Sequence, residues 1–397
     1  MSKNTHLEHL EDDILNNGSE GGKNAILFLK SLGKMLEGPS SSSIAVTTKW
    51  DGAPALVCGK DPQNGHFFVG TKSVFNKTNP KICYNEFHID NLYPGSGGLN
   101  YVLKKCLKEL SKLSFSGVLQ GDLLWCGSTV TQTVGGENCV TFTPNTITYA
   151  VPTGTPLATK IQQSDIGIVF HTKYTGTTIA TMTAGFGVTT PPASTQQCVV
   201  LSSSFSDATG ASQFTPAEKT AYNSAVNRAS GSLKQASEFL NVLKDTGQGK
   251  FLLAVMFKQF FNSYIRTGTS LTNTKAVTAN FANYYQQALN KQINSVKTPS
   301  AKGKWQKVQA DGLKFIKTYN RSIYMTVASY LNLISAKTMV VKKLSKVQDI
   351  GTFIRTDDGF RVTAPEGFVA IKDMKALKIV DRIEFSKSNF TVAKNWG

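Results

Sequence analysis

The chain has 397 residues, of which 40% are hydrophobic, and its formal net charge at pH 7 is +17. This length and hydrophobic content predict two or three folded domains and exclude a largely disordered chain. No stretch approaches the roughly 18 uninterrupted apolar residues of a membrane span, and the polar N-terminus lacks the apolar region of a signal peptide. We therefore expect a cytoplasmic protein without a membrane partner, located in the host cytoplasm if a virus encodes it.

Residues 1–40 have the apolar spacing of two short helices, with Gly18 and the pair Gly21-Gly22 between them. Four acidic side chains lie in the first helix: Glu8, Glu11, Asp12 and Asp13. We interpret them as a solvated helix face, and metal binding is the alternative. The six cysteines are scattered without a Cys-x-x-Cys pair, so we expect reduced thiols and no structural zinc.

Residues 41–205 have the β-branched, aromatic and alternating character of strands. We expect strands over residues 44–48, 55–58, 66–70, 117–125, 140–143, 146–151, 165–171, 178–182 and 198–201. The turn sequence Asp61-Pro62-Gln63-Asn64-Gly65 predicts a hairpin between the second and third of these strands. One helix is expected over residues 99–113, where leucines recur on one face.

Residues 206–347 change to helical periodicity. Thr215-Pro216-Ala217-Glu218 predicts a helix start, because it combines a capping threonine, a proline at the first helical position and a glutamate three residues after the cap. Further helices are expected over residues 250–266, 274–296 and about 304–346, with a break in the last one as an open alternative, and strands return after residue 351. The aromatic side chains between residues 251 and 264 are more typical of a helix core than of a surface on which nucleobases stack.

The positive charge is concentrated in this helical segment. Residues 206–347 hold twenty Lys or Arg and five Asp or Glu, a surplus of +15 out of the total of +17. Binding of several phosphates by such a segment releases counterions and steers association, so nucleic acid is the expected partner. A lysine-rich surface that only improves solubility is the alternative.

Lys49-Trp50-Asp51-Gly52 follows directly on the predicted strand at residues 44–48. A strand fixes the direction of the lysine that ends it, and a glycine after the acid allows close approach of the backbone to a ligand. A lysine amine becomes a nucleophile when burial or a neighbouring cation keeps it neutral. The pattern Lys-x-Asp-Gly resembles the active-site signature of the covalent nucleotidyltransferases, which include ATP-dependent RNA and DNA ligases and mRNA capping enzymes.

Later segments resemble the further motifs of this family in the expected order. Val69-Gly70-Thr71-Lys72-Ser73 places Lys72 where RNA ligases have a phosphate-binding cation. Gly121-Asp122 resembles the Gly-Glu motif whose carboxylate binds the ribose, although the acid here is one methylene shorter. The segment 165–171 resembles the motif with a purine-stacking ring, for which Phe170 is the first candidate and His171 the second.

The last two family motifs resemble residues near the end of the sequence. Glu366-Gly367 matches the motif whose glutamate lies beside the metal and the reactive phosphate. The final motif, usually two lysines one residue apart, is matched less closely by Lys372, Lys375 and Lys378, with Lys378 the best candidate. The resemblance implies that Lys49, Glu366 and Lys378 are catalytic and that Glu366 binds metal. The residues that it implies for nucleotide binding are Thr48, Asp51, Gly52, Lys72, Asp122, Phe170 and Lys375.

The resemblance implies an α+β fold with an antiparallel-sheet, ATP-grasp-like nucleotidyltransferase core that a mainly α-helical basic insertion interrupts. The expected organisation is an N-terminal helical segment at 1–40, core residues 41–205, the insertion at 206–347, and core residues 348–397. It implies a polynucleotide ligase that uses ATP and Mg²⁺, with Mn²⁺ possible, and that forms a lysyl-AMP on Lys49. We expect deletion of the insertion to spare the nucleotide chemistry.

Departures from the family pattern leave alternatives open. Pro54 stands where many ligases have Arg or Asn, and Thr48 stands where RNA ligases often have glutamate. The sequence ends about twenty residues after Lys378, without the C-terminal domain expected of DNA ligases and capping enzymes, which favours RNA as substrate. The alternatives are a DNA ligase, another lysyl-nucleotide transferase and a catalytically degenerate nucleic-acid-binding protein. Singly, Gly121-Asp122 and Glu366-Gly367 are also typical of turns, Phe170 of core, and the lysines of a solvated face.

Overall fold

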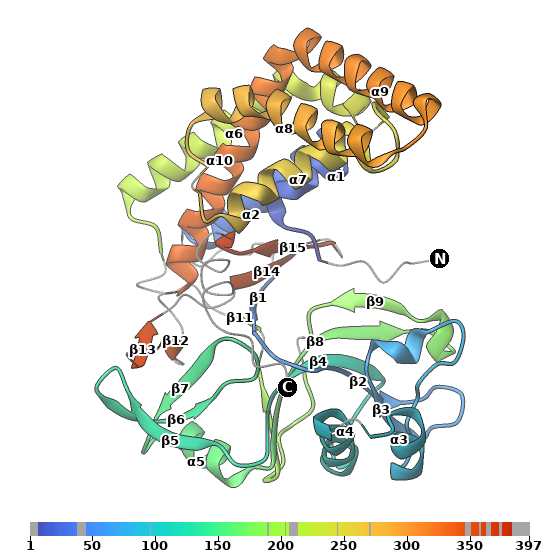
Figure 1. Ribbon diagram of the computed structural model, residues 1–397. Helices are drawn as coiled ribbons and strands as arrows, with labels where there is room; N and C mark the ends of the chain where they lie inside the picture. Colours follow the sequence, from blue (N-terminus) through green and yellow to red (C-terminus); the bar gives the residue numbers. More distant parts are fainter. Residues whose placement is uncertain are drawn as a thin grey trace.

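The computed structural model describes residues 7–37, 45–95, 97–188, 190–202, 204–205, 213–243, 245–269, 271–345, 351–356, 359–362, 367–372 and 375–382. These residues form a mixed α+β structure of three sheets and the helices α1 to α10 (Figure 1). A layer of long helices covers a small central sheet, and two larger sheets lie beyond it (Figure 1). None of the described helices combines the length and the apolar composition that spanning a membrane requires.

The helical layer is built from the N-terminal segment and from the segment between residues 216 and 344. Its helices are α1 (Asp13–Asn16), α2 (Gly18–Met35), α6 (Pro216–Leu243), α7 (Leu253–Arg266), α8 (Thr274–Ser295), α9 (Pro299–Thr318) and α10 (Asn320–Leu344). The predicted capping box is confirmed, since Thr215 N–H donates to Glu218 and Glu218 N–H donates back to the Thr215 hydroxyl. The helix expected over residues 304–346 is two helices, which meet at Tyr319.

One hydrophobic core joins these helices to each other and to the central sheet. Phe257 and Phe261 of α7 are completely buried in it, which confirms the prediction that the aromatic residues of this helix form a core. Side chains of α2 also lie in this core. Deletion of residues 206–347 would therefore expose the apolar face of α2 and one face of the central sheet. The insertion is not the separable unit that the sequence suggested.

The central sheet, sheet A, has the strand order β11 (Ser204–Phe205), β1 (Ala45–Lys49), β14 (Gly367–Lys372) and β15 (Lys375–Ile379), all antiparallel. In its register Lys49 lies opposite Gly367, and Val369 lies between Thr47 and Lys378. Successive side chains of a strand point to opposite faces. Phe368 and Ile379 therefore enter the helical core. Thr47, Lys49, Val369 and Lys378 share the other face, which we call the pocket face.

Sheet B has the order β10 (Cys198–Leu201), β8 (Ile166–Thr175), β4 (Val118–Cys126), β2 (Ala55–Lys60) and β3 (Phe67–Gly70), with β9 (Thr183–Phe186) beside β8. Its pairs are antiparallel except β10 with β8. Helices α3 (Glu86–Leu92) and α4 (Gly97–Leu110) lie beside this sheet (Figure 1). The predicted strand at 178–182 is wrong: residues 179–181 form a 3-10 turn, and the strand begins at Thr183.

Sheet C has the order β13 (Gly359–Val362), β12 (Gly351–Thr356), β7 (Thr148–Pro152), β6 (Glu137–Phe142) and β5 (Val130–Val134). It packs with α5 (Pro156–Gln163) against sheet B through a second apolar cluster that contains Trp125 and Tyr149. Strand β5 and helices α3 and α5 were not anticipated from the sequence. All six cysteines are free and five of them are buried, and burial raises the pKa of the Cys198 thiol to about 12.

The interpretation of the N-terminal acidic residues as a solvated face is wrong for Glu11, Asp12 and Asp13, which are buried. Lys337 Nζ of α10 lies 2.7 Å from both carboxylate oxygens of Glu11. The Tyr330 hydroxyl and the Arg382 guanidinium donate to Asp12 at 2.7 and 3.1 Å. Buried charges are tolerated when they are paired in this way. Among the described residues, no three metal-ligating side chains gather at one point.

Candidate functional site

A pocket lies between the pocket face of sheet A and the edges of β4, β8 and β9, and we call it the strand pocket. Its lining residues are Leu7, Thr47, Thr48, Lys49, Trp50, Asp122, Val169, His171, Phe186, Gly187, Val369 and Ile371. About 70 Å³ of the pocket is wide enough for water. Small-molecule sites usually have roughly 300–1,000 Å³, so a larger ligand requires the lining side chains to move apart.

Lys49 is the last residue of β1, and its half-buried side chain lines the strand pocket together with Thr48. Residues 50–54 connect β1 to β2, and we call them the lysine loop. Gly52 explains how this loop comes so close to β4. A Cβ atom at Gly52 would lie 2.5 Å from the Cβ of Asp122 and 3.0 Å from the carbonyl oxygen of Leu123. Only glycine permits this approach, so Gly52 acts by bringing Lys49 and Asp122 to one site.

Asp51 has a different environment from the one expected of a nucleotide ligand. Its buried carboxylate accepts hydrogen bonds from Asn145 Nδ2 and from the backbone N–H groups of Thr146 and Ile147, at 2.8, 2.8 and 2.9 Å. Its own N–H donates to the Tyr149 hydroxyl at 2.7 Å. Both carboxylate oxygens are thus occupied by the β6–β7 turn, and Asp51 does not line the strand pocket. It attaches the lysine loop to sheet C.

Asp122 and His171 face each other in the strand pocket. The distance between Asp122 Oδ1 and His171 Nε2 is 3.5 Å, and the two side chains are 21% and 28% exposed. His171 Nδ1 lies 2.8 Å from the Thr172 hydroxyl, which holds the ring in place. An exposed carboxylate beside a flat ring can accept hydrogen bonds from hydroxyl groups while the ring contacts an apolar surface.

Phe170 does not line the strand pocket. Its side chain is 1% exposed and lies in the core of sheet B, where its ring packs edge-on against Phe115 at 5.6 Å. Asp122 pairs with Val169 across β4 and β8, so residues 169 and 171 share the face of Asp122. The second aromatic candidate, His171, therefore occupies the place that the sequence assigned first to Phe170. The register between β4 and β8 decides which of the two neighbouring residues, Phe170 or His171, faces the pocket.

The candidate lysines are separated in space. Lys72 is exposed in the turn after β3 and Lys375 is exposed on β15, and neither lines the strand pocket. Lys375 pairs with Lys372 and belongs to the face of sheet A opposite Lys49. Lys378 shares the pocket face with Lys49. Glu366 lies outside the described residues, and Gly367, which follows it, is the cross-strand partner of Lys49.

The N-terminal residues near the pocket were not anticipated from the sequence. Leu7 lines the strand pocket, and the backbone N–H of Lys378 donates to the Glu8 carbonyl at 2.8 Å. The Glu8 carboxylate pairs with Lys258 of α7, also at 2.8 Å. Burial, with Arg382 and three lysines nearby, lowers the pKa of His9 well below its usual value. The N-terminus thus brings the helical layer into contact with the pocket face.

Trp50 is a further lining residue that the sequence argument used only as part of the motif. Its ring lies 4.9 Å from that of Tyr149, and the side chain is 9% exposed. In the described part of the chain, its indole N–H has no hydrogen-bond partner. A buried N–H without a partner costs free energy, so a ligand oxygen that reaches it would be stabilised.

Comparison with known proteins gives a family but no activity. A model described as "Family of unknown function (DUF6267)" matches residues 4–394. No curated protein and no solved structure matches the chain.

Proposed function

The chain belongs to the DUF6267 family of unknown function, and we propose that it is an ATP-dependent polynucleotide ligase with RNA as its first candidate substrate. The reaction begins with nucleotidyl transfer to Lys49. The Lys49 amine attacks the α-phosphorus of ATP, a P–N bond forms, and the bond to pyrophosphate breaks. The AMP group then passes to a 5′-phosphate end, and attack by a 3′-hydroxyl releases AMP.

The convergence of four separate segments on one pocket supports this proposal most strongly. Thr48 and Lys49 come from the strand end that carries the Lys-x-Asp-Gly motif, Asp122 from the Gly121-Asp122 motif, and His171 from the segment 165–171. Val369 comes from β14, two residues after Gly367. These segments lie far apart in the sequence. Their meeting around the one lysine is what a lysyl-nucleotide site requires.

The proposed roles of Asp122, His171 and Lys378 follow from their chemistry. Asp122 accepts hydrogen bonds from the ribose hydroxyls, and His171 contacts the purine face. Lys378, on the pocket face, is the cation for the phosphate groups. Because phosphoryl transfer needs positioning and charge stabilisation above all, one nucleophile with a few fixed polar groups is sufficient.

The residues present fit a magnesium ion. Magnesium binds to proteins through one or two carboxylates together with substrate phosphate oxygens, and it does not require a dense acidic cluster. Glu366 is the proposed ligand, because Gly367, which follows it, lies opposite Lys49, and Asp122 is left to bind the ribose. The ion, or Mn²⁺ in its place, would neutralise charge on the triphosphate.

Incubation with α-labelled ATP and magnesium tests the proposal. The denatured protein should retain the label, and peptide mapping should locate AMP on Lys49. Lys49→Ala should remove the label. Lys60→Ala is the matched control, because Lys60 is an exposed lysine at the end of β2. Equal labelling of Lys49→Ala and the parent protein excludes lysyl chemistry at this residue. Binding of nucleic acid without any labelling favours the degenerate binding protein.

A further inference from the structure

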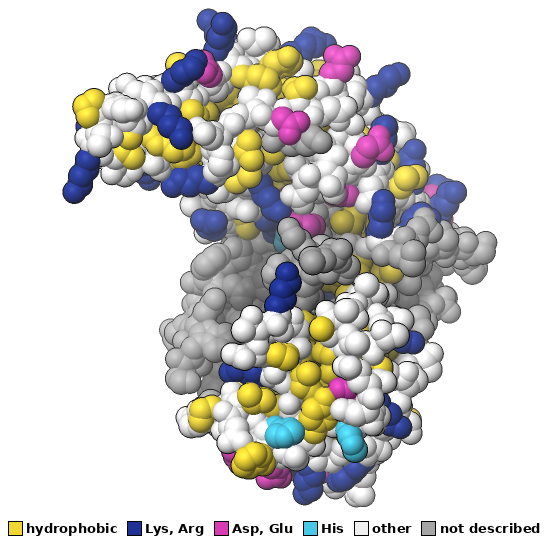
Figure 2. Space-filling view, turned by 90° about the vertical axis from the view of Figure 1, so that its right-hand side faces the viewer, with side chains coloured by type: hydrophobic (Ala, Val, Ile, Leu, Met, Phe, Trp, Pro, Cys, Tyr) yellow, Lys and Arg dark blue, Asp and Glu magenta, His cyan; other side chains and the backbone are white. Residues whose placement is uncertain are grey.

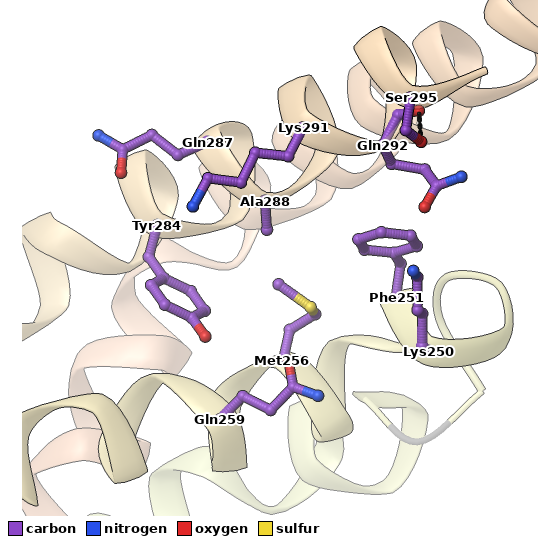
Figure 3. Close-up of a pocket in the computed structure, with 10 residues that line it drawn as sticks. All are labelled: Lys250, Phe251, Met256, Gln259, Tyr284, Gln287, Ala288, Lys291, Gln292 and Ser295. Atoms are coloured by element: carbon purple, nitrogen blue, oxygen red, sulfur yellow. Dashed lines mark hydrogen bonds between the residues drawn. The ribbon is translucent and has the colours of Figure 1, made fainter. Parts of the chain in front are cut away.

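A second hollow lies in the helical layer, far along the sequence from the strand pocket, and we call it the helical groove. It has a volume of about 460 Å³. Figure 3 shows residues of α8 facing residues of α7 and of the 3-10 turn Gly249–Phe251 across the opening. The lining residues are Lys250, Phe251, Met256, Gln259, Tyr284, Gln287, Ala288, Lys291, Gln292 and Ser295.

The helical groove combines an apolar floor with a polar rim. Phe251 and Met256 are 5% and 1% exposed, so they form its floor. Its rim carries the amides of three glutamines: Gln259, Gln287 and Gln292. Within the described residues, these amides have no hydrogen-bond partner and therefore remain available to a ligand. No acidic side chain is among the lining residues.

Positive charge stands on both sides of the helical groove. Lys250 and Lys291 are exposed, and neither forms an ion pair with a described residue. The Lys250 amine lies 5.3 Å from the centre of the Phe251 ring. Beyond it, the Trp305 ring contacts Phe251 at 5.2 Å and carries Lys304 over its own face at 5.4 Å. Two neighbouring aromatic rings thus each carry a lysine amine along this edge.

This set of groups matches one chemical unit, a nucleotide. Lysine amines bind phosphate, and the amide groups of glutamine can form paired hydrogen bonds with the edge of a nucleobase. Apolar and aromatic side chains accept the face of the base. In a duplex, the base faces are stacked and the Watson–Crick edges are paired, so only an unpaired nucleotide presents all of these surfaces.

We propose that the helical groove binds an unpaired nucleotide of single-stranded nucleic acid, with Lys250 and Lys291 on the phosphates and the glutamines on the base. The proposal rests on the nucleic-acid partner of the proposed function but not on the lysyl chemistry. Figure 2 shows that Lys and Arg side chains are spread widely over the helical layer. Charge alone therefore does not define a binding site. The helical groove does, because it adds an apolar floor and glutamine amide groups to the positive charge.

Fluorescence anisotropy with labelled oligonucleotides of about 12 nucleotides, in RNA, DNA and duplex form, tests the proposal. Lys250→Ala/Lys291→Ala loses two phosphate contacts and should weaken single-strand binding about 10- to 30-fold at about 0.1 M salt. The slope of log K against log salt concentration, which we call the salt slope, should fall in magnitude by roughly 1.4. The control Lys234→Ala/Lys275→Ala removes equal charge from exposed positions outside the groove and should change affinity less than about threefold.

An uncharged variant separates base recognition from charge. Gln287→Ala/Gln292→Ala should weaken binding about three- to tenfold and leave the salt slope unchanged. RNA bound more tightly than DNA assigns the ligand to RNA, and equal affinity assigns it to single strands of either kind. Equal losses in the groove and control variants overturn the proposal, as does tighter binding of the duplex or of polyglutamate. Labelling at Lys49 is measured separately, so its failure leaves this test intact.

Discussion

Asp51 shows that a motif residue can be required for its packing. Its carboxylate accepts three hydrogen bonds from residues 145–147, and the lysine loop is held on sheet C by these contacts. In the sequence, the Asp-Gly pair indicated nucleotide binding. In the structure, Asp51 and Gly52 both serve to place Lys49, one through hydrogen bonds and the other through close approach to Asp122.

We expect Asp51→Ala to lower the free energy of unfolding by about 3 kcal/mol in the absence of any nucleotide, because it leaves buried N–H groups without an acceptor. Urea denaturation measures this effect. Asp90→Ala is the control, since the pair of Asp90 with Lys104 is exposed to water and should contribute far less to stability. If Asp51→Ala has parental stability and only loses ATP affinity, the packing role is wrong.

The neighbours Phe170 and His171 should have opposite phenotypes. Phe170→Ala removes a buried ring and should destabilise the fold by about 3–5 kcal/mol. His171→Ala removes a partly exposed pocket side chain, so unfolding should change little, while ATP affinity should fall by about 1–3 kcal/mol if the ring stacks on the base. Thermal unfolding and ATP titration of both variants check the assignment. The reverse pattern would place Phe170 at the nucleotide.

At the scale of elements, the seam between α2 and α6 depends on glycines in α2. A Cβ atom at Gly33 would lie 2.6 Å from Cε1 of Tyr222, and one at Gly22 would lie 2.5 Å from Cδ1 of Leu233. Tyr222 cannot easily withdraw, because its hydroxyl donates to the Leu29 carbonyl and the ring is buried. The pair Gly21-Gly22, which was expected between two helices, therefore lies inside α2, and Gly22 and Gly33 allow this helix to pack closely on α6.

Gly33→Ala should destabilise the protein by roughly 1–3 kcal/mol, although alanine is the better helix former, because the added methyl overpacks the seam. Gly231→Ala in α6 is the matched control. No atom lies within 4 Å of the position of its added Cβ, so we expect a gain of up to about 1 kcal/mol. Guanidinium denaturation of both variants gives the comparison, and a stabilised Gly33→Ala would contradict the close seam.

At the scale of the whole molecule, residues from the N-terminus, the insertion and the C-terminal strands meet around sheet A. Glu11 pairs with Lys337, and Asp12 contacts Tyr330 and Arg382. The helical core continues from α2 through α6 to the inner face of β14. Because the insertion covers this sheet, removing it exposes apolar surface and buried charges together. The helical layer and the strand pocket are therefore parts of one folded unit.

His9 makes this assembly sensitive to pH. Its pKa is lowered well below 6.5 by burial and by Arg382, Lys337, Lys378 and Lys49, so the ring is neutral in the folded protein. Below pH 6.5 the unfolded chain binds the proton and the fold does not, and stability therefore falls as the pH falls. The fall should reach about 1.4 kcal/mol per pH unit.

Urea denaturation between about pH 7.5 and about pH 5.5 measures this dependence, with His9→Gln as the reference variant. The parent protein should lose stability more steeply than His9→Gln as the pH is lowered. The difference between the two slopes isolates His9 from the carboxylates of the same cluster. Parallel slopes would mean that His9 binds its proton equally well in the folded and the unfolded chain, so that folding does not lower its pKa.

The amino-acid sequence determined those features that depend on neighbours along the chain. Helical periodicity and the capping box identified α6, α7 and α8, strand-like composition identified the strands that carry Lys49 and Asp122, and a turn sequence identified the hairpin of β2 and β3. The tertiary structure decided what depends on distant partners. It placed His171 rather than Phe170 in the pocket, because this follows from the register of β8 on β4. It also buried Glu11, because the cation that neutralises it, Lys337, comes from a helix more than three hundred residues away.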